Sequence, residues 1–153
     1  MSAPFPPVRR PPHRESRILK PEDAENAIEL VKQALPFFRA GEPIVHPDRV
    51  DVPVLYLDFA IDRVHYDPRT GNPSPKGILP HAKPSMEGAR ERIEEVLKEA
   101  RVLDGAEFRE PEDCWIVPVA WKSFIILHVR VSADAKELIP DYHLTEEVRR
   151  HGL

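Results

Sequence analysis

The chain repeats its own pattern at a constant offset of 65 residues, and this internal similarity restricts the fold more than any other feature. Residues 22–75, laid over residues 87–140 without a gap, give 14 identical pairs in 54 positions, where a shuffled chain of this composition would give about four. The matches continue through two strand-like segments: Val52/Val117, Pro53/Pro118, Val54/Val119, Phe59/Phe124, Ile61/Ile126 and Val64/Val129. One offset that holds through helix, loop and strands predicts an internal duplication of one folding unit.

Each copy of the unit is predicted to begin with an amphipathic helix. In the first copy, apolar residues recur at steps of three and four from residue 24 to residue 38, the period of one buried helical stripe. Pro21 suits the first turn of this helix, and Pro36 is expected to end or kink it. In the second copy, the helix is predicted to start after Pro84 with Ser85 as its N-cap.

Two strands and a short third strand are predicted to follow each helix. The second copy predicts strands over residues 114–121, 124–132 and 136–140, and the first copy over residues 50–57 and 59–66, with a weak third segment after residue 71. We therefore predict an α+β fold of two tandem α-β-β-β repeats that form one mostly antiparallel sheet, with two long helices packed on one face. One common core is expected, because a domain of about 60 residues is marginal alone.

The chain divides into four segments: residues 1–18, an extended Pro/Arg-rich arm; 19–82, repeat one with its Pro-rich linker; 83–143, repeat two with a three-stranded meander; and 144–153, a short C-terminal helix. Thr145 is the predicted N-cap of that last helix, and Gly152 is expected just past its end. The arm has two interpretations. It is either a loose terminus or an extended segment that lies across a partner subunit, held by its arginines and Phe5.

The stretch VHYDPRTG, residues 64–71, carries a resemblance to a known family. A helix, two strands, this turn and a further short strand resemble the PepSY unit, a small cystatin-like module that often ends in an Asp-x-x-Thr-Gly turn. In repeat two, VRVSADAKELIP occupies the same place without the Thr and the Gly. The resemblance implies a binding or inhibitory role rather than catalysis, in a family whose members are commonly exported.

Charge and composition argue against several classes of protein. A net charge of −4 gives no general attraction to nucleic acid or to an anionic membrane. No apolar run approaches the roughly 18 residues of a membrane-spanning helix. The N-terminal sequence MSAPFPPVRRPP has no apolar signal-peptide core, so a cytoplasmic location is expected. The scarcity of Asn and Gln beside 18 Pro residues is typical of thermophile proteins and equally compatible with chance.

The sequence contains no recognisable catalytic motif. The seven histidines show neither an i,i+4 helical pair nor a His-x-His spacing, and the phosphate-loop and nucleophile-elbow patterns do not occur. Cys114 is the single cysteine, and its place at the start of an apolar strand beside Trp115 favours a core residue over a nucleophile. We therefore expect no catalytic residue, no metal and no cofactor. A metal site assembled through space is the alternative left open.

One set of side chains stands out from this background. Strand alternation puts Arg63 and His65 on one face of the second strand of repeat one, and His128 and Arg130 on the same face of repeat two. That face also carries Phe59, Ile61, Phe124 and Ile126, whereas the opposite face, with Ala60, Val64 and Tyr66, is expected to receive the helices. The outward face is then either a sheet surface whose basic tips reach water, or an interface or anion site at the repeat dyad. The candidate anion- or partner-binding residues are Arg63, His65, His128, Arg130, Phe59 and Phe124.

The leading hypothesis is a non-enzymatic binding module of unknown ligand, a homodimer that uses the outer sheet face. Two alternatives stay open. One is a small enzyme with a site between the repeats, built from His65, His128 and a carboxylate such as Asp62. The other is an accessory subunit of a larger complex, gripped by the arm. Expected partners are a second copy or another protein, with a small anionic ligand as a further option and without nucleic acid or membrane.

Overall fold

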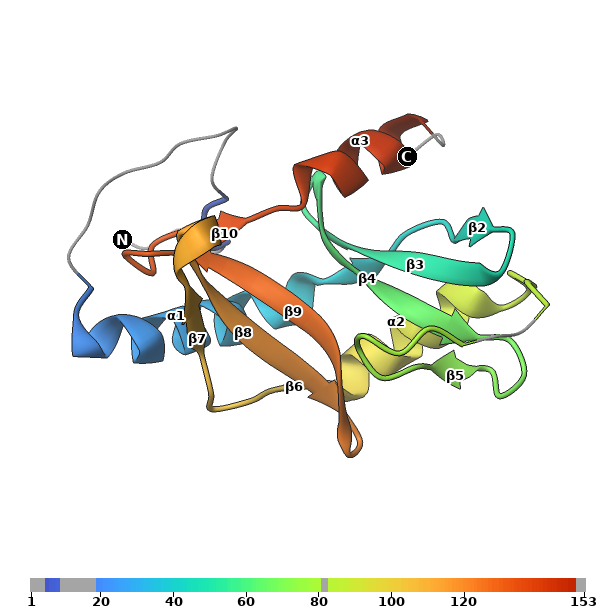
Figure 1. The fold of residues 1–153 in the computed structure, drawn as a ribbon, viewed down its shortest axis with the longest axis horizontal. Coiled ribbons are helices and arrows are strands. Elements are labelled where there is room, and N and C mark those ends of the chain that lie inside the picture. Colours follow the sequence, from blue (N-terminus) through green and yellow to red (C-terminus); the bar gives the residue numbers. More distant parts are fainter. Residues whose placement is uncertain (1–4, 9–18, 81–82, 151–153) are drawn as a thin grey trace.

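Two antiparallel sheets and three α-helices make up the described part of the chain, residues 5–8, 19–80 and 83–150 of a computed structural model (Figure 1). The first half contains α1 (Pro21–Ala34), the 3-10 turn η1 (Leu35–Phe37), β1 (Arg39–Ala40), β2 (Ile44–His46), β3 (Arg49–Tyr56), β4 (Phe59–Asp67) and β5 (Asn72–Pro73). The second half contains α2 (Ala89–Glu99), β6 (Arg101–Val102), β7 (Glu107–Arg109), η2 (Glu110–Glu112), β8 (Cys114–Trp121), β9 (Phe124–Ser132), β10 (Leu138–Ile139) and α3 (Tyr142–Arg150). The prediction of an α+β fold with antiparallel pairing is confirmed.

The strands form two sheets rather than the single shared sheet that was predicted. One sheet has the order β1-β3-β4-β5 with β2 also on β3, and the other has the order β10-β9-β8-β6 with β7 also on β8. β4 and β9 lie next to each other where the sheets meet. At this seam, the carboxylate of Asp62 accepts a hydrogen bond from the backbone N–H of His128 at 2.8 Å. A side chain thus takes the place of a strand carbonyl, which interrupts the ladder between the two sheets.

Several backbone features recur in the two halves at the offset seen in the sequence. The strand register shifts between Val54 and Leu55 in one hairpin and between Val119 and Ala120 in the other. Leu57 and Lys122, which begin the two hairpin turns, both have positive φ, 55° and 54°. The hydrogen bonds between the halves are also reciprocal: the N–H of Lys76 donates to the carbonyl of Ile125 at 2.7 Å, and that of Asp141 to the carbonyl of Ala60 at 2.9 Å. Descent of both halves from one duplicated unit stays a prediction.

Each long helix makes its main strand contacts with the sheet of the other half. α1 contacts β6, β8 and β9, whereas α2 contacts β1, β3 and β5 and also touches β8 (Figure 1). Side chains of both helices join both sheets in one apolar cluster, which includes Val31, Ala34, Ile93 and Val96. Neither half can therefore bury its own helix without the other half. The placement of both helices on one face stays a prediction.

The observed start of α1 agrees with the prediction, whereas the observed starts of α2 and α3 differ from it. α1 begins at Pro21 as expected, and Pro36 lies in the 3-10 turn that follows it. α2 begins at Ala89 rather than after Ser85, because Gly88 adopts a left-handed conformation with φ of 71° directly before it.

Thr145 is inside α3 rather than at its N-cap. The helix is capped instead by the Asp141 carboxylate, which accepts the N–H of Leu144 at 2.9 Å. The predicted role of Gly152 lies outside the described residues.

The two register shifts also correct the predicted faces of the second strands. Each shift is a β-bulge, an extra residue that changes the side to which the following side chains point. Ile61 and Ile126, predicted to face outward, are therefore buried in the main core. Ala60, predicted to face the helices, lies instead in a small second core with Ile44, Leu55, Leu144 and Val148. This second core seats α3 beside the β3–β4 turn (Figure 1).

The described part of the N-terminal arm docks on its own chain. The buried carbonyl of Pro6 accepts a hydrogen bond from the Tyr56 hydroxyl at 2.9 Å, and the carbonyl of Pro7 accepts one from the N–H of Leu138 at 2.8 Å. Phe5 packs edge-on against Phe37 with ring centroids 4.7 Å apart. Residues 5–8 are thus held by the body of the same protein, and the rest of the predicted arm, residues 1–4 and 9–18, lies outside the described residues.

Candidate functional site

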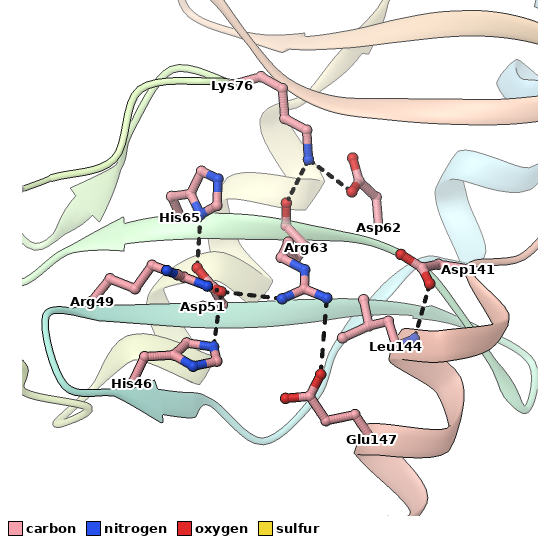
Figure 2. A network of polar contacts seen from close by, with 10 residues as sticks. All are labelled: His46, Arg49, Asp51, Asp62, Arg63, His65, Lys76, Asp141, Leu144 and Glu147. Atoms are coloured by element: carbon pink, nitrogen blue, oxygen red, sulfur yellow. Dashed lines mark hydrogen bonds and ion pairs between the residues drawn. The ribbon is translucent and has the colours of Figure 1, made fainter.

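A buried carboxylate in the middle of β3 is the centre of the candidate site. Asp51 is fully buried, although the strand around it is almost entirely apolar. The two residues between β2 and β3 form a tight turn, which pairs His46 with Arg49, and the β3–β4 register puts His65 directly opposite Asp51. Three neighbouring strands therefore direct basic side chains at one carboxylate (Figure 2).

Four basic groups surround the two oxygens of Asp51. His65 Nδ1 lies 2.7 Å from Oδ1. Arg49 Nε and Arg63 Nη1 donate hydrogen bonds to Oδ2 at 3.2 Å and 3.4 Å. His46 Nε2 lies 3.2 Å from the same oxygen without the geometry of a hydrogen bond, so its contact with Asp51 is one of proximity. We name these five residues the Asp51 network. A buried carboxylate without such partners would carry a large desolvation cost, so the network accounts for how this charge is tolerated.

The surroundings of Asp51 oppose one another in their effect on its pKa. Burial raises the pKa of this carboxyl, but the hydrogen bond and charge of His65, followed by those of Arg49, lower it to about 2. A carboxylate with so low a pKa is ionised throughout the neutral range and is a weak proton acceptor. The chemistry of the network is therefore that of a fixed charge rather than of a general base.

The C-terminal helix covers one side of the Asp51 network. Glu147 of α3 lies 3.9 Å from Arg63, which is also bound to Asp51 (Figure 2). Leu144 and Val148 of the same helix pack on Leu55 and Ala60. α3 thus joins the outer face of the first sheet through both a charged contact and an apolar contact.

A second polar group lies at the seam between the two sheets. Lys76 Nζ donates to the Asp62 carboxylate at 2.7 Å and to the carbonyl of Arg63 at 3.2 Å (Figure 2). The other oxygen of Asp62 accepts the N–H of His128. Burial lowers the pKa of the His128 imidazole, and the nearby Lys76 charge lowers it further. Asp62 therefore has its carboxylate bound on both oxygens and links the two sheets.

Arg130 belongs to a third group, on the second sheet. Its Nε donates to Glu112 at 3.1 Å, and the same carboxylate lies 3.9 Å from Arg109. Cys114 Sγ is 3.8 Å from Glu112. Burial and the adjacent Glu112 charge raise the pKa of the Cys114 thiol to about 11, so the thiolate needed for nucleophilic attack is scarce at neutral pH.

The four basic candidates from the sequence are therefore divided among separate networks. Arg63 and His65 meet at Asp51, whereas His128 lies beside Asp62 and Lys76, and Arg130 binds Glu112. The aromatic candidates are half-buried near the hairpin turns: Arg149 of α3 lies over the Phe59 ring at 6.0 Å, and Phe124 packs edge-on against Trp121 at 5.7 Å.

Sequence reasoning missed Asp51, although a signal was present. An acidic residue between Val50 and Val52, in a strand that is otherwise almost wholly apolar, indicates a buried charge that needs partners. The residue 65 positions later in the chain, in the second half, is Ile116, so the network belongs to the first half alone. The half that contains Asp51 is also the half on whose sheet α3 packs.

The described residues contain no group of three or more His, Cys, Asp or Glu side chains arranged to hold a metal ion. Within residues 5–8, 19–80 and 83–150, no helix has the length and apolar composition needed to cross a membrane.

Comparison of the chain with protein-family models, with curated proteins and with solved structures finds no match in any of the three. The PepSY resemblance stays a prediction.

Proposed function

We propose that this protein is a non-enzymatic binding module that self-associates through the outer face of its second sheet. The observation that carries the proposal is the contrast between the two outer faces. On the first sheet, α3 packs on Leu55 and Ala60. The residues at the matching positions of the second sheet are Ala120 and Ile125, and Ile125 is only half-buried. Ala120 is buried, at 2% exposure, so the open part of this face is the half-buried side chain of Ile125 and its neighbours.

The residues around Ile125 suit a second copy of the chain. Pro118 and His128 are cross-strand partners, and both are half-buried beside Ile125. Arg130 and Glu112, whose side chains are 33% and 41% exposed, add one charge of each sign at the border. A patch with an apolar middle and both signs of charge is self-complementary in a two-fold dimer.

The states of the reactive groups support binding over catalysis. The Asp51 carboxyl, with its pKa near 2, and the Cys114 thiol, with its pKa near 11, are both far from the range of a general base or nucleophile at neutral pH. The enzyme alternative relied on His65, His128 and Asp62. Asp62 accepts the backbone N–H of His128, whereas the imidazole of His65 contacts Asp51 in a separate network. No observation favours that alternative.

Native mass spectrometry of the full chain tests the proposal. We expect a dimer for the natural sequence and a monomer for Ile125→Asp, because an aspartate in the middle of the interface would bury an unpaired charge. Val45→Asp is the matched control, since Val45 is 49% exposed and lies in β2 of the first sheet, so the dimer should persist. His128→Ala, which keeps the backbone bond to Asp62, provides a milder variant and should weaken the dimer.

A monomeric natural sequence would contradict the proposal, as would an Ile125→Asp dimer of unchanged stability. A complex with a different protein, purified from the native host, would favour the accessory-subunit alternative.

A further inference from the structure

A cavity lies on the helix side of the molecule, at the junction of the two halves. It has a volume of about 380 Å³, and five apolar residues line it: Leu35, Pro36, Phe38, Leu97 and Ala100. The size falls in the usual range for small-molecule sites, about 300–1,000 Å³. Leu35 and Ala100 are matching positions of the two repeats, and both contribute to the wall. Because Ala100 lines the cavity, a larger side chain at position 100 would extend into it.

Two charged side chains of α2 complete the lining, Glu94 and Lys98. They are four residues apart on one helix, so one turn, about 6 Å of rise, separates their positions. Glu94 Oε1 accepts the N–H of Ala40 at 2.9 Å, which fixes this carboxylate beside the cavity. Within the described part of the chain, neither the second oxygen of Glu94 nor the ammonium of Lys98 has an assigned partner.

From this arrangement we propose that the cavity binds an apolar or aromatic α-amino acid in its zwitterionic form. Its ammonium group would bind Glu94, its carboxylate would bind Lys98, and its side chain would occupy the apolar part of the cavity. A ligand with only a carboxylate would be attracted by Lys98 but repelled by Glu94. A ligand with only an ammonium group would be attracted by Glu94 but repelled by Lys98. A zwitterion is complementary to both charges at once.

Isothermal titration calorimetry with L-phenylalanine and L-leucine tests this site on the full chain. Two analogues of phenylalanine that each lack one charge, 3-phenylpropanoate and phenethylamine, are the ligand controls. We expect each analogue to bind at least about tenfold more weakly than phenylalanine, because each leaves one charged group without its partner. Equal affinity for either analogue would overturn the proposed recognition.

Substitutions locate the site within the protein. Ala100→Leu, which copies the residue of the other repeat, should fill the cavity and abolish binding while the melting temperature stays level or rises. Lys98→Gln and Glu94→Gln should each weaken binding at least about tenfold. Lys83→Gln is the control of equal charge change, because Lys83 is exposed and does not line the cavity.

The proposal fails if neither amino acid binds at millimolar concentration, or if Ala100→Leu binds phenylalanine as tightly as the natural sequence. Lys98→Gln alters an exposed residue and leaves the apolar wall intact, so it keeps the test decisive even if Ala100→Leu does not fold. Circular dichroism of each variant identifies that case.

Discussion

At the scale of the residue, burial of the Asp51 carboxylate costs desolvation energy, and its contacts with basic side chains offset that cost. Ile116 lies 65 residues later, in β8 of the second sheet, and carries no charge, so a strand of this kind does not require a carboxylate in order to form. Removing one partner from a buried charge network is nevertheless costly, because the groups left behind remain buried and unpaired. The contribution of Asp51 is therefore best measured by its loss and by its dependence on pH.

Asp51→Asn keeps the shape of the side chain and removes its charge. We expect it to lower the free energy of unfolding at neutral pH by about 3–5 kcal/mol, measured by urea denaturation. Asp58→Asn is the matched control, because Asp58 is exposed, and it should change stability by less than about 0.5 kcal/mol. A loss as small as that of the control would contradict the structural role of the Asp51 network.

The difference in stability between the natural sequence and Asp51→Asn should depend on pH, and its direction can be predicted. The pKa of the Asp51 carboxyl falls from 3.8 in the unfolded chain to about 2 in the folded protein. Its ionisation therefore stabilises the fold by about 2 kcal/mol above pH 4, and this contribution disappears as the pH falls towards 2. The stability difference between the natural sequence and Asp51→Asn should shrink over that interval. A constant difference would mean that the charge of Asp51 is not what stabilises the network.

Leu57 is a residue in an unfavourable backbone conformation. Its φ of 55° is left-handed, a conformation that costs a leucine about 1–2 kcal/mol, and its side chain is 41% exposed. Leu57→Asn should raise the melting temperature, since asparagine adopts this conformation more readily and little packing is lost. Leu57→Ala loses the same packing without relieving the strain and should give no gain. Equal melting temperatures for the two variants would contradict this account.

At the scale of the element, Thr145 attaches α3 to the first sheet. Its hydroxyl accepts the N–H of Ala60 at 2.9 Å and donates to the carbonyl of Asp141 at 2.7 Å, and the residue is only 3% exposed. Thr145→Val keeps the shape and leaves the N–H of Ala60 without its acceptor. We expect a loss of about 1–3 kcal/mol in unfolding free energy. Thr70→Val is the control and should lose less than about 0.5 kcal/mol, because the hydroxyl of Thr70 makes its bonds to Asp67 and Asn72 at an exposed turn, where water can replace them.

The sequence predicted whole elements better than their details. Hydrophobic periods and prolines placed α1, β8 and β9 correctly, because these signals are local. The bulges beside Leu55 and Ala120 carry no local signal, since an extra residue in one strand depends on its partner strand. Alternation alone therefore assigned Ile61 and Ile126 to the wrong face.

The candidate site was also predicted only in part, because the sequence carries local signals but not the contacts between distant segments. Alternation placed Arg63 and His65 together, and both contact Asp51. The separation of His128 and Arg130 from them follows from Asp62, Lys76 and Glu112, whose positions depend on how the two sheets meet. Such contacts between distant segments are not contained in the period of a single strand.

At the scale of the whole molecule, each long helix packs mainly on the sheet of the other half. This exchange of helices predicts that the two halves stabilise each other. A protease site inserted between residues 80 and 83 and then cut should yield two pieces that stay together in size-exclusion chromatography and unfold in one transition. The physical reason is that α1 is buried mainly on β8 and β9, and α2 mainly on β1 and β3. Each piece purified alone should show little helix by circular dichroism. Separation of the cut pieces into two folded domains would contradict this account.

The same exchange constrains how the protein acquires its structure during synthesis. α1 leaves the ribosome early, but the strands that bury it, β8 and β9, follow about 90 residues later. Such distant contacts raise the contact order and slow folding, and they leave the apolar stripe of α1 open to protease and to chaperones until the second sheet is made. A nascent chain stalled at residue 113 should therefore be cleaved within residues 21–34 by a protease that spares the same segment once β9 has emerged.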